Sequence, residues 1–111
     1  MAECIFCKII NKDMPTKLLY EDDHIVAFND IHPKAPVHIL VVTKEHIGSL
    51  KEVEAKHEKL MFHILTKLQH IAQINNISDF RTIVNTGPKS GQEIFHLHFH
   101  ILGGEGKLAG F

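Results

Sequence analysis

Residues 96–102 read His-Leu-His-Phe-His-Ile-Leu, an alternation of histidine with large apolar residues. Because successive side chains on a β-strand point to opposite faces, this alternation predicts a strand, which we place over residues 94–102. One face of that strand carries three histidines: His96, His98 and His100. The other face is apolar and can seal a core: Leu97, Phe99 and Ile101. Imidazoles spaced roughly 6.6 Å apart along one face can lie beneath a single ligand.

Histidine is also the outlier of the composition, with 10 residues among 111. It is the side chain that titrates near neutral pH, binds metals and attacks electrophiles. Basic and acidic residues nearly balance, at 12 and 13, and Arg81 is the only arginine. This balance argues against a basic nucleic-acid clamp or a polybasic membrane patch, so we expect neither nucleic acid nor a membrane as a partner.

The longest apolar run, residues 39–42, is far shorter than the roughly 20 residues of a membrane span. The first residues do not show the basic-then-apolar order of a secretory signal. We therefore expect a cytoplasmic protein.

The remaining sequence predicts an α+β fold. Apolar residues at spacings of three and four run from Leu50 to Ala72 and predict one long helix, and residues 5–10 favour a short N-terminal helix. Strands are predicted at residues 18–21, 25–29, 37–43, 80–84 and 94–102. Because three strands precede the long helix and two follow it, we expect an antiparallel meander. No repeat or linker divides the chain, so residues 1–111 are expected to form a single domain.

The residues alone leave the chemistry of the three-histidine face open. Histidines two residues apart on a strand have a common metal-ligand spacing. A neutral imidazole is equally a nucleophile near pH 7, and its attack on phosphorus would give a phosphohistidine. The preceding loop, residues 85–93, favours a phosphate, because Gly87 and Gly91 let backbone N–H groups approach an oxyanion. A purely structural role of these histidines is the third alternative.

The stretch from His96 to Leu102 resembles the signature of the histidine-triad (HIT) family, in which three histidines alternate with apolar residues. Other parts of the chain are similar to segments of that family: residues 5–10 (IFCKII), 27–31 (AFNDI), 33–38 (PKAPVH), 44–46 (KEH), 85–87 (NTG) and 91–93 (GQE). The closing Gly103-Gly104 resembles the Hint branch, the histidine-triad nucleotide-binding proteins. The resemblance implies a HIT-like fold, with an antiparallel five-stranded sheet, one long central helix and a short N-terminal helix.

The resemblance also implies a function. Hint proteins are homodimers that bind purine nucleoside monophosphates and hydrolyse purine nucleoside phosphoramidates. By position in the motif, His98 would be the nucleophile that takes the nucleotidyl group, and His100 would contact the phosphate. His96 would be structural. This catalysis would require no cofactor.

Nucleotide-binding residues follow from the same resemblance. An apolar slot for the base would be made by Ile5, Phe6, Ile9, Phe28 and Ile31. Asp30 would accept hydrogen bonds from the ribose hydroxyls. Four loop residues would surround the phosphate and ribose: Asn85, Gly91, Gln92 and Glu93.

Two features depart from some relatives. Glu93 stands where others carry serine, and a carboxylate repels a phosphate unless it points away or carries a proton. The tail after Gly104 is shorter than in relatives whose aromatic tail reaches the partner's site, and Phe111 is a candidate substitute.

Cys4 and Cys7 form a Cys-x-x-Cys pair. In a cytoplasmic chain such a pair is half of a zinc site, a redox pair or two reduced thiols. Two cysteines alone do not complete a tetrahedral zinc site. Members of the histidine-triad superfamily with this pair suggest the other two ligands, here His46 and His96. The resemblance thus implies a structural Zn²⁺.

Two rival functions stay open at the level of sequence. One is a nucleotide-binding regulatory or interaction protein that has the same fold and no catalytic role. The other is a metal-dependent hydrolase with the three triad histidines as ligands. The remaining histidines are expected to be solvated or structural: His63 and His70 lie on one side of the long helix, towards solvent or a partner, and His38 is expected in the core.

Overall fold

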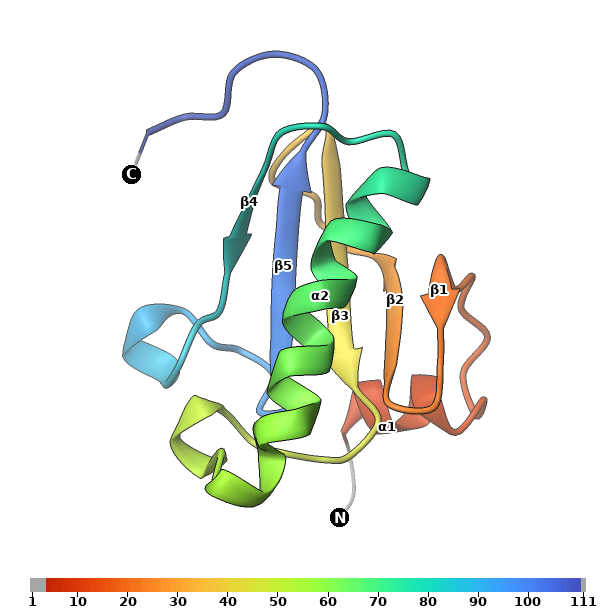
Figure 1. The fold of residues 1–111 in the computed structure, drawn as a ribbon, viewed down its shortest axis with the longest axis vertical. Helices are drawn as coiled ribbons and strands as arrows, with labels where there is room; N and C mark the ends of the chain where they lie inside the picture. Colours follow the sequence, from red (N-terminus) through yellow and green to blue (C-terminus); the bar gives the residue numbers. More distant parts are fainter. Residues whose placement is uncertain (1–3, 111) are drawn as a thin grey trace.

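The computed structural model describes residues 4–110, and the candidate tail aromatic Phe111 lies outside this range. A short helix, α1 (Ile5–Ile10), is followed by three strands: β1 (Tyr20–Glu21), β2 (Ile25–Asn29) and β3 (Val37–Thr43). The long helix α2 (Glu58–Ile74) comes next. The chain then forms β4 (Phe80–Ile83), a 3₁₀ turn (Pro88–Ser90) and β5 (His98–Gly103), as Figure 1 shows.

The five strands form one antiparallel sheet in the order β1-β2-β3-β5-β4. The predicted α+β class, with five antiparallel strands and two helices, is therefore confirmed. The expected meander is wrong at its last step, because β5 lies between β3 and β4 and leaves β4 at the edge. The side chains of β5 are buried on both faces, whereas those of β4 are half-buried or exposed. The central position thus goes to the strand that removes more apolar surface from water.

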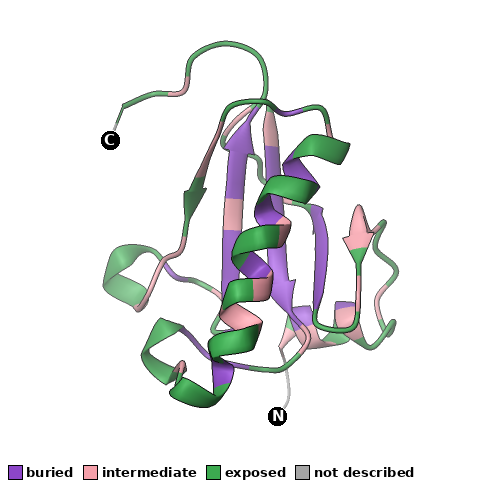
Figure 2. Ribbon diagram, in the orientation of Figure 1, coloured by how far each residue is buried: buried purple, intermediate pink, exposed green. Residues whose placement is uncertain are grey.

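Helix α2 covers one face of the sheet, and its apolar side forms the larger core (Figures 1 and 2). The helix contributes Ile64, Leu68 and Ile71 to this core. Alternate strand residues meet them, such as the facing pairs Ile39–Ile101 and Val41–Phe99. Each fully buried side chain of this size contributes about 1.5–3 kcal/mol. The layer under α2 is therefore the main source of apolar stabilisation of the sheet.

The opposite face of the sheet carries a smaller apolar cluster beneath α1. Its buried members are Phe6, Ile9, Val26, Phe28, Leu40 and Val42. The pairing of β3 with β5 sets Leu40 opposite His100 and Val42 opposite His98. Both histidines consequently lie on the face that α2 leaves open.

The long helix begins later than the apolar spacing predicts. Residues 50–57 form two 3₁₀ turns, η1 (Leu50–Glu52) and η2 (Ala55–His57), and α2 starts at Glu58. Between the turns the backbone is extended, and the Glu54 N–H donates to Nδ1 of His57 at 2.9 Å. Because 3₁₀ turns also place residues three apart on one side, apolar spacing alone does not distinguish them from a helix.

The last strand is also shorter than predicted. The ladder between β3 and β5 ends at the pair Val42–His98, and residues 94–96 form a bend. Leu97 packs into the main core and its N–H donates to the Ile47 carbonyl at 2.6 Å. His96 therefore leaves the strand face on which the alternation places it, because this loop contact replaces the ladder. Within residues 4–110, no helix is both long and apolar enough to cross a membrane.

Gly103 closes β5 where no side chain fits. A Cβ at this position would lie 2.6 Å from Cγ2 of Ile77 and 2.9 Å from the Asp79 carbonyl oxygen. We expect Gly103→Ala to lower the free energy of unfolding by about 1–3 kcal/mol, the usual cost of overpacking. Urea denaturation measures it, with Gly110→Ala as control, because a Cβ there meets nothing within 4 Å. Equal stability of the two variants would contradict the expectation.

Candidate functional site

His98 and His100 lie side by side on β5, with ring centroids 5.1 Å apart. His98 is nearly buried, and Nδ1 of its ring donates to the His96 carbonyl oxygen at 2.6 Å. Because a carbonyl only accepts, the proton of the neutral ring lies on Nδ1 and the lone pair on Nε2. No hydrogen bond within residues 4–110 involves Nε2, and no fully buried side-chain nitrogen there lacks a partner, so Nε2 has no protein partner and keeps some contact with solvent. This is the form in which an imidazole acts as a nucleophile.

His100 has the opposite arrangement because of His38 on β3. The Lys34 N–H donates to Nδ1 of His38 at 3.0 Å, so a neutral His38 carries its proton on Nε2. That nitrogen lies 2.8 Å from Nδ1 of His100, which must accept, and 3.4 Å from a carboxylate oxygen of Asp30. A neutral His100 then carries its proton on Nε2. The two neighbouring imidazoles thus offer one lone pair and one N–H.

His38 was expected as a core residue, and it is buried as expected. Its contact with His100 adds a functional position that the sequence interpretation missed. The signal was present, because residues 38, 40 and 42 alternate on one face of β3, the face that carries His98 and His100 on β5. Finding it required knowing that β3 and β5 are neighbours.

Burial, with the neighbouring His98 and His38 imidazoles adding to it, lowers the pKa of His100 from 6.5 to about 4. Between these pH values the unfolded chain binds a proton at this residue and the folded chain does not. The stability contributed by the neutral ring is therefore present above pH 6.5 and is lost as the pH falls towards 4, at no more than about 1.4 kcal/mol per pH unit.

We expect this loss to be smaller in His100→Asn, which has no titrating ring at the position. Urea denaturation of both proteins at pH 7, 6 and 5 measures the difference. Parallel pH dependences would contradict a neutral, buried His100.

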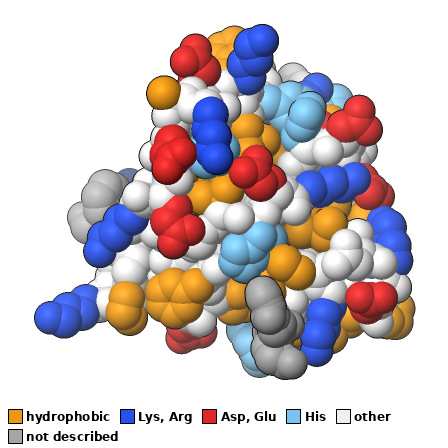
Figure 3. All heavy atoms as spheres, turned by 90° about the horizontal axis from the view of Figure 1, so that it is seen from below, with side chains coloured by type: hydrophobic (Ala, Val, Ile, Leu, Met, Phe, Trp, Pro, Cys, Tyr) orange, Lys and Arg blue, Asp and Glu red, His pale blue; other side chains and the backbone are white. Residues whose placement is uncertain are grey.

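Three of the five residues predicted to form an apolar slot for a base are neighbours in the structure. Phe6 and Ile9 of α1 and Phe28 of β2 are buried together. The Phe6 ring makes edge contacts with Phe28 and with His98, with centroids 5.7 and 5.1 Å apart. Ile5 is 39% exposed and Ile31 84% exposed, so these two lie at the surface rather than in the cluster. Space-filling atoms at this end of the molecule show histidine reaching the surface beside hydrophobic side chains (Figure 3).

Two glycines and one buried glutamine determine the conformation of the loop of residues 85–93. Gly87 and Gly91 have φ of +91° and +105°, which glycine adopts without strain. Gln92 is buried, its Oε1 accepts from the Gly87 N–H, and its Nε2 donates to the carbonyls of Gly48 and Ile94. Because both amide hydrogens are used, the Gln92 side chain supports the loop. Asn85 is half-buried and lies about 4.0 Å from the Cβ position of Gly91.

Glu93 is exposed and lines a surface pocket of about 290 Å³ together with Cys4, Ile5, Ile94 and Phe95. Asp30 stands at the end of β2, where one carboxylate oxygen accepts from the His32 N–H at 2.8 Å and the other faces His38. Each oxygen keeps a second lone pair, which suits a ligand hydroxyl.

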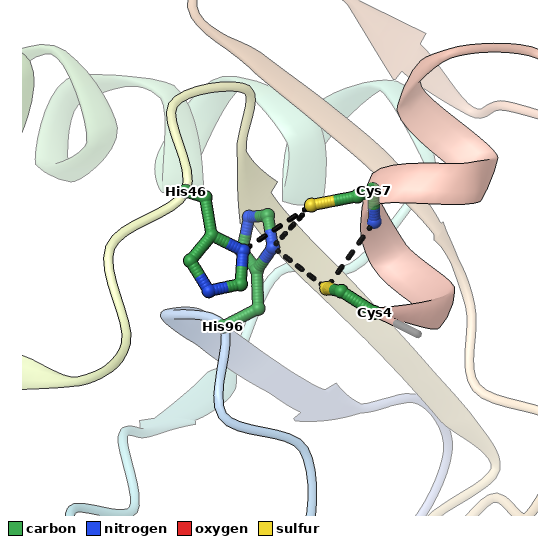
Figure 4. A group of neighbouring side chains, drawn as sticks. All are labelled: Cys4, Cys7, His46 and His96. Atoms are coloured by element: carbon green, nitrogen blue, oxygen red, sulfur yellow. Dashed lines mark hydrogen bonds between the residues drawn. The ribbon is translucent and has the colours of Figure 1, made fainter. Parts of the chain in front are cut away.

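Cys4 and Cys7 meet His46 and His96 at one point (Figure 4). The cysteines come from the start of α1, His46 from the loop after β3 and His96 from the bend before β5. Their ligand atoms all lie within 4.8 Å of one another. Nδ1 of His96 is 3.2 Å from Cys4 Sγ, and Nδ1 of His46 is 3.2 Å from Cys7 Sγ. The four residues named from the sequence are therefore neighbours in space.

This donor set fits a zinc ion. With Zn–S near 2.3 Å and Zn–N near 2.0–2.1 Å, tetrahedral sulfur and nitrogen ligands lie about 3.6 Å apart. Nε2 of His96 donates to the Thr43 carbonyl at 2.7 Å, which leaves Nδ1 as the ligand atom. Metal-binding histidines typically make such a hydrogen bond with their second ring nitrogen. Burial lowers the pKa of His96 to about 4, so its ring is neutral. Burial and the adjacent Cys4 raise the pKa of Cys7 to about 11, so a cation must stabilise its thiolate.

The three triad histidines do not converge on a common point. Within residues 4–110, clusters able to hold a metal are the four-residue set above and Asp30, His38 and His100, and neither contains His98. Other histidines have separate partners: His63 bonds Asp22 at 2.6 Å, and His70 packs on the Tyr20 ring. This geometry disfavours the rival in which His96, His98 and His100 hold one catalytic metal.

The fold and the site together define an α+β protein with two neighbouring imidazoles on the face of a five-stranded antiparallel sheet that α2 leaves open. Residues 3–110 match the family model described as "Scavenger mRNA decapping enzyme C-term binding". Protein HitA of Neisseria gonorrhoeae is 44% identical over 104 residues, 93% of this chain and 97% of HitA. A purine nucleoside phosphoramidase of Escherichia coli K12 is 40% identical over 92% of this chain and 87% of its own.

Solved structures agree. A histidine triad protein from Clostridium difficile has a TM-score of 0.92 and 44% identity, covering 100% of this chain and 99% of that one. A HIT family hydrolase from Legionella pneumophila has a TM-score of 0.89 and 37% identity, covering 94% and 95%. The chain belongs to the histidine-triad family.

Proposed function

We propose that this protein is a hydrolase of purine nucleoside phosphoramidates, of the Hint branch, that acts through a nucleotidyl-His98 intermediate. The observation that carries the proposal is the pair of complementary imidazoles, with an open lone pair on His98 and an N–H on His100. The similarity to a purine nucleoside phosphoramidase supports the substrate class.

In the first step, Nε2 of His98 attacks the phosphorus of the phosphoramidate. A bond forms between phosphorus and Nε2, the phosphorus–nitrogen bond to the amine breaks, and the electron pair leaves with the amine. The amine takes a proton from a water molecule in the site, which becomes hydroxide, while Nε2–H of His100, fixed by the 2.8 Å contact with His38, donates a hydrogen bond to the reacting group. The low pKa of His100 keeps its ring neutral, so Nε2–H donates a hydrogen bond and is not transferred.

In the second step, the hydroxide formed from that water attacks the phosphorus of the nucleotidyl-histidine. The phosphorus–Nε2 bond breaks, His98 returns to its Nδ1–H form, and the nucleoside monophosphate leaves. Charge on the phosphoryl oxygens needs fixed donors during both steps. The loop held by Gln92 is expected to present those backbone N–H groups that it does not use internally, because Arg81 is the only arginine of the chain.

The nucleotide is expected beneath α1. Phe6, Ile9 and Phe28 would contact the base, with Ile5 and Ile31 at the rim, and Asp30 would accept from the ribose hydroxyls. Asn85, Gly91 and Glu93 would lie towards the phosphate and ribose. Glu93 is exposed, which supports a carboxylate that points away from the anion.

A zinc ion on Cys4, Cys7, His46 and His96 is part of the proposal. Four protein ligands close the coordination shell, so the ion would supply structural stability and no open position for substrate. Catalysis itself would need no cofactor.

Incubation with adenosine 5′-phosphoramidate, acid-free quenching and intact-mass measurement tests the proposal. We expect release of adenosine monophosphate and a transient nucleotidyl adduct that peptide mapping assigns to His98. Nucleotide binding without turnover would instead favour the regulatory protein. Loss of turnover in a chelator, with the fold intact and recovery upon adding one metal, would favour metal-dependent hydrolysis.

We also propose a homodimer formed through α2 and β4. Phe62 and Leu65 of α2 are 70% and 60% exposed, and Ile83 of the edge strand β4 is exposed as well. Phe62 lies on the same side of the helix as Gln69 and Gln73, which line a pocket of about 480 Å³ with Phe80 of β4. Apolar side chains beside an unpaired strand edge suit a second copy of the same surface.

We expect Phe62→Asp to convert the dimer to a monomer at micromolar concentration, because it places a charge in a desolvated contact. Sedimentation equilibrium measures the change. Lys17→Asp, at an exposed position between α1 and β1 and away from α2 and β4, is the matched control. A wild-type monomer at these concentrations would contradict the dimer.

A further inference from the structure

His96 connects the candidate metal centre to the candidate nucleophile. Its imidazole is completely buried, with Nδ1 towards the cysteine sulfurs and Nε2 bonded to Thr43. Its carbonyl oxygen accepts the 2.6 Å hydrogen bond from Nδ1 of His98. One residue therefore supplies a metal ligand through its side chain and sets the ring orientation of His98 through its backbone.

The backbone that carries this carbonyl is not held by the sheet. The β3–β5 ladder ends at the pair Val42–His98, so the His96 carbonyl lies just beyond it. Leu97 N–H bonds the Ile47 carbonyl, and Ile47 follows the ligand His46. The ring centroids of His46 and His96 are 4.5 Å apart. The loop after β3 and the bend before β5 are thus joined by the contact between the His46 and His96 rings and by one backbone hydrogen bond.

Helix α1 provides the second connection. Phe6 lies between the two cysteines in sequence, and its ring makes edge contacts with His96 and His98 at centroid distances of 5.9 and 5.1 Å. Both cysteine sulfurs contact His96 or His46. A helix of six residues has little stability of its own, so ligands at its first turn hold Phe6 against the His98 ring.

We propose that the Cys4–Cys7–His46–His96 centre positions His98: metal binding fixes the His96 carbonyl and the Phe6 ring, and so controls the tautomer and orientation of the nucleophile. This inference rests on the proposed function for the role of His98 and on the fit of the four donors to zinc. It makes metal occupancy a regulator of the nucleotide site, beyond a contribution to stability.

The main core does not depend on this centre. The cluster under α2 contains Leu97 but none of the four ligands, and the sheet ladders run from β1 to β4 without them. Loss of the metal is therefore expected to release α1 and residues 94–96 while Leu97 and the sheet under α2 stay folded. This separation lets positioning be measured apart from folding.

The test uses the zinc-loaded full chain, the same protein stripped with a chelator, and two variants. His46→Ala removes the ligand that touches neither His98 nor the base slot. His46→Cys keeps a zinc ligand in its place, and His70→Ala on the exposed side of α2 is the control. The readouts are bound zinc, long-range ¹H–¹⁵N spectra of the His98 ring without nucleotide, affinity for adenosine monophosphate, and the rate of adduct formation.

We expect zinc-loaded wild type and His46→Cys to show His98 as the single Nδ1–H tautomer. Stripped wild type and His46→Ala should show a second tautomer or broadened ring signals, and adduct formation about 10- to 100-fold slower. Their unfolding should remain cooperative. His46→Ala that loses zinc but keeps the wild-type His98 spectrum would overturn the inference, and so would collapse of the whole sheet upon stripping.

The His98 spectrum also separates this inference from the proposed function. It is recorded without substrate, so a metal-dependent tautomer supports the positioning role even in a chain that hydrolyses no phosphoramidate. Conversely, full phosphoramidase activity with a spectrum indifferent to zinc would leave the function standing and remove the positioning role.

Discussion

His98→Ala is expected to slow hydrolysis of adenosine 5′-phosphoramidate by at least about 10⁴-fold and to abolish the covalent adduct. The open Nε2 lone pair of His98 is the proposed attacking atom, and its removal leaves a site that still binds nucleotide but has no nucleophile. Single-turnover kinetics measures the rate, and intact mass after quenching measures the adduct.

Two companion variants make this result interpretable. His98→Asn keeps a polar side chain of similar size next to Phe6, so it guards against a loss of activity caused by a cavity. His70→Ala removes an exposed imidazole on α2 and should behave as wild type. Adduct formation that persists in both His98 variants would show that another residue is the nucleophile.

His38→Leu is expected to lower kcat by about 100-fold, within the range for the loss of one oriented hydrogen-bond donor, with little change in KM. Leucine fills the buried space but removes the N–H that holds Nδ1 of His100 as an acceptor. The proton of His100 is then no longer confined to the nitrogen that faces the leaving group. Steady-state kinetics across pH measures the effect, and His100 ring spectra should show a mixture of tautomers.

Thermal unfolding separates this effect from damage to the fold, since His38 lies opposite Leu102 in the middle of the sheet. Asp30→Asn is the matched comparison: it keeps the size of the residue near His38 and should raise KM through the ribose more than it lowers kcat. A kcat within twofold of wild type in His38→Leu would reduce His38 to a packing role.

Much of the fold could be predicted from local pattern because the strands differ sharply in burial. Residues 37–43 are apolar and β-branched, and β3 begins and ends at the predicted residues. The predictions failed where side chains replaced backbone partners. His57 accepts from the backbone between two 3₁₀ turns, and Leu97 bonds a loop carbonyl before β5 begins. Such exchanges depend on neighbours distant in sequence, so periodicity does not report them.

For the candidate site, too, one part could be predicted from the sequence and another part depends on the tertiary structure. By itself, the sequence determined the fold class, the aligned His98 and His100, and the cysteine pair Cys4 and Cys7, because residue type and alternation reside in the chain, whereas His46 and His96 followed from the resemblance to the family. Tertiary structure alone decided that β5 lies beside β3, which brings His38 to His100 and assigns opposite proton positions to neighbouring imidazoles. The physical reason is that a hydrogen bond's direction is set by the partner across the sheet, and pairing between distant strands is settled only when the whole core is buried.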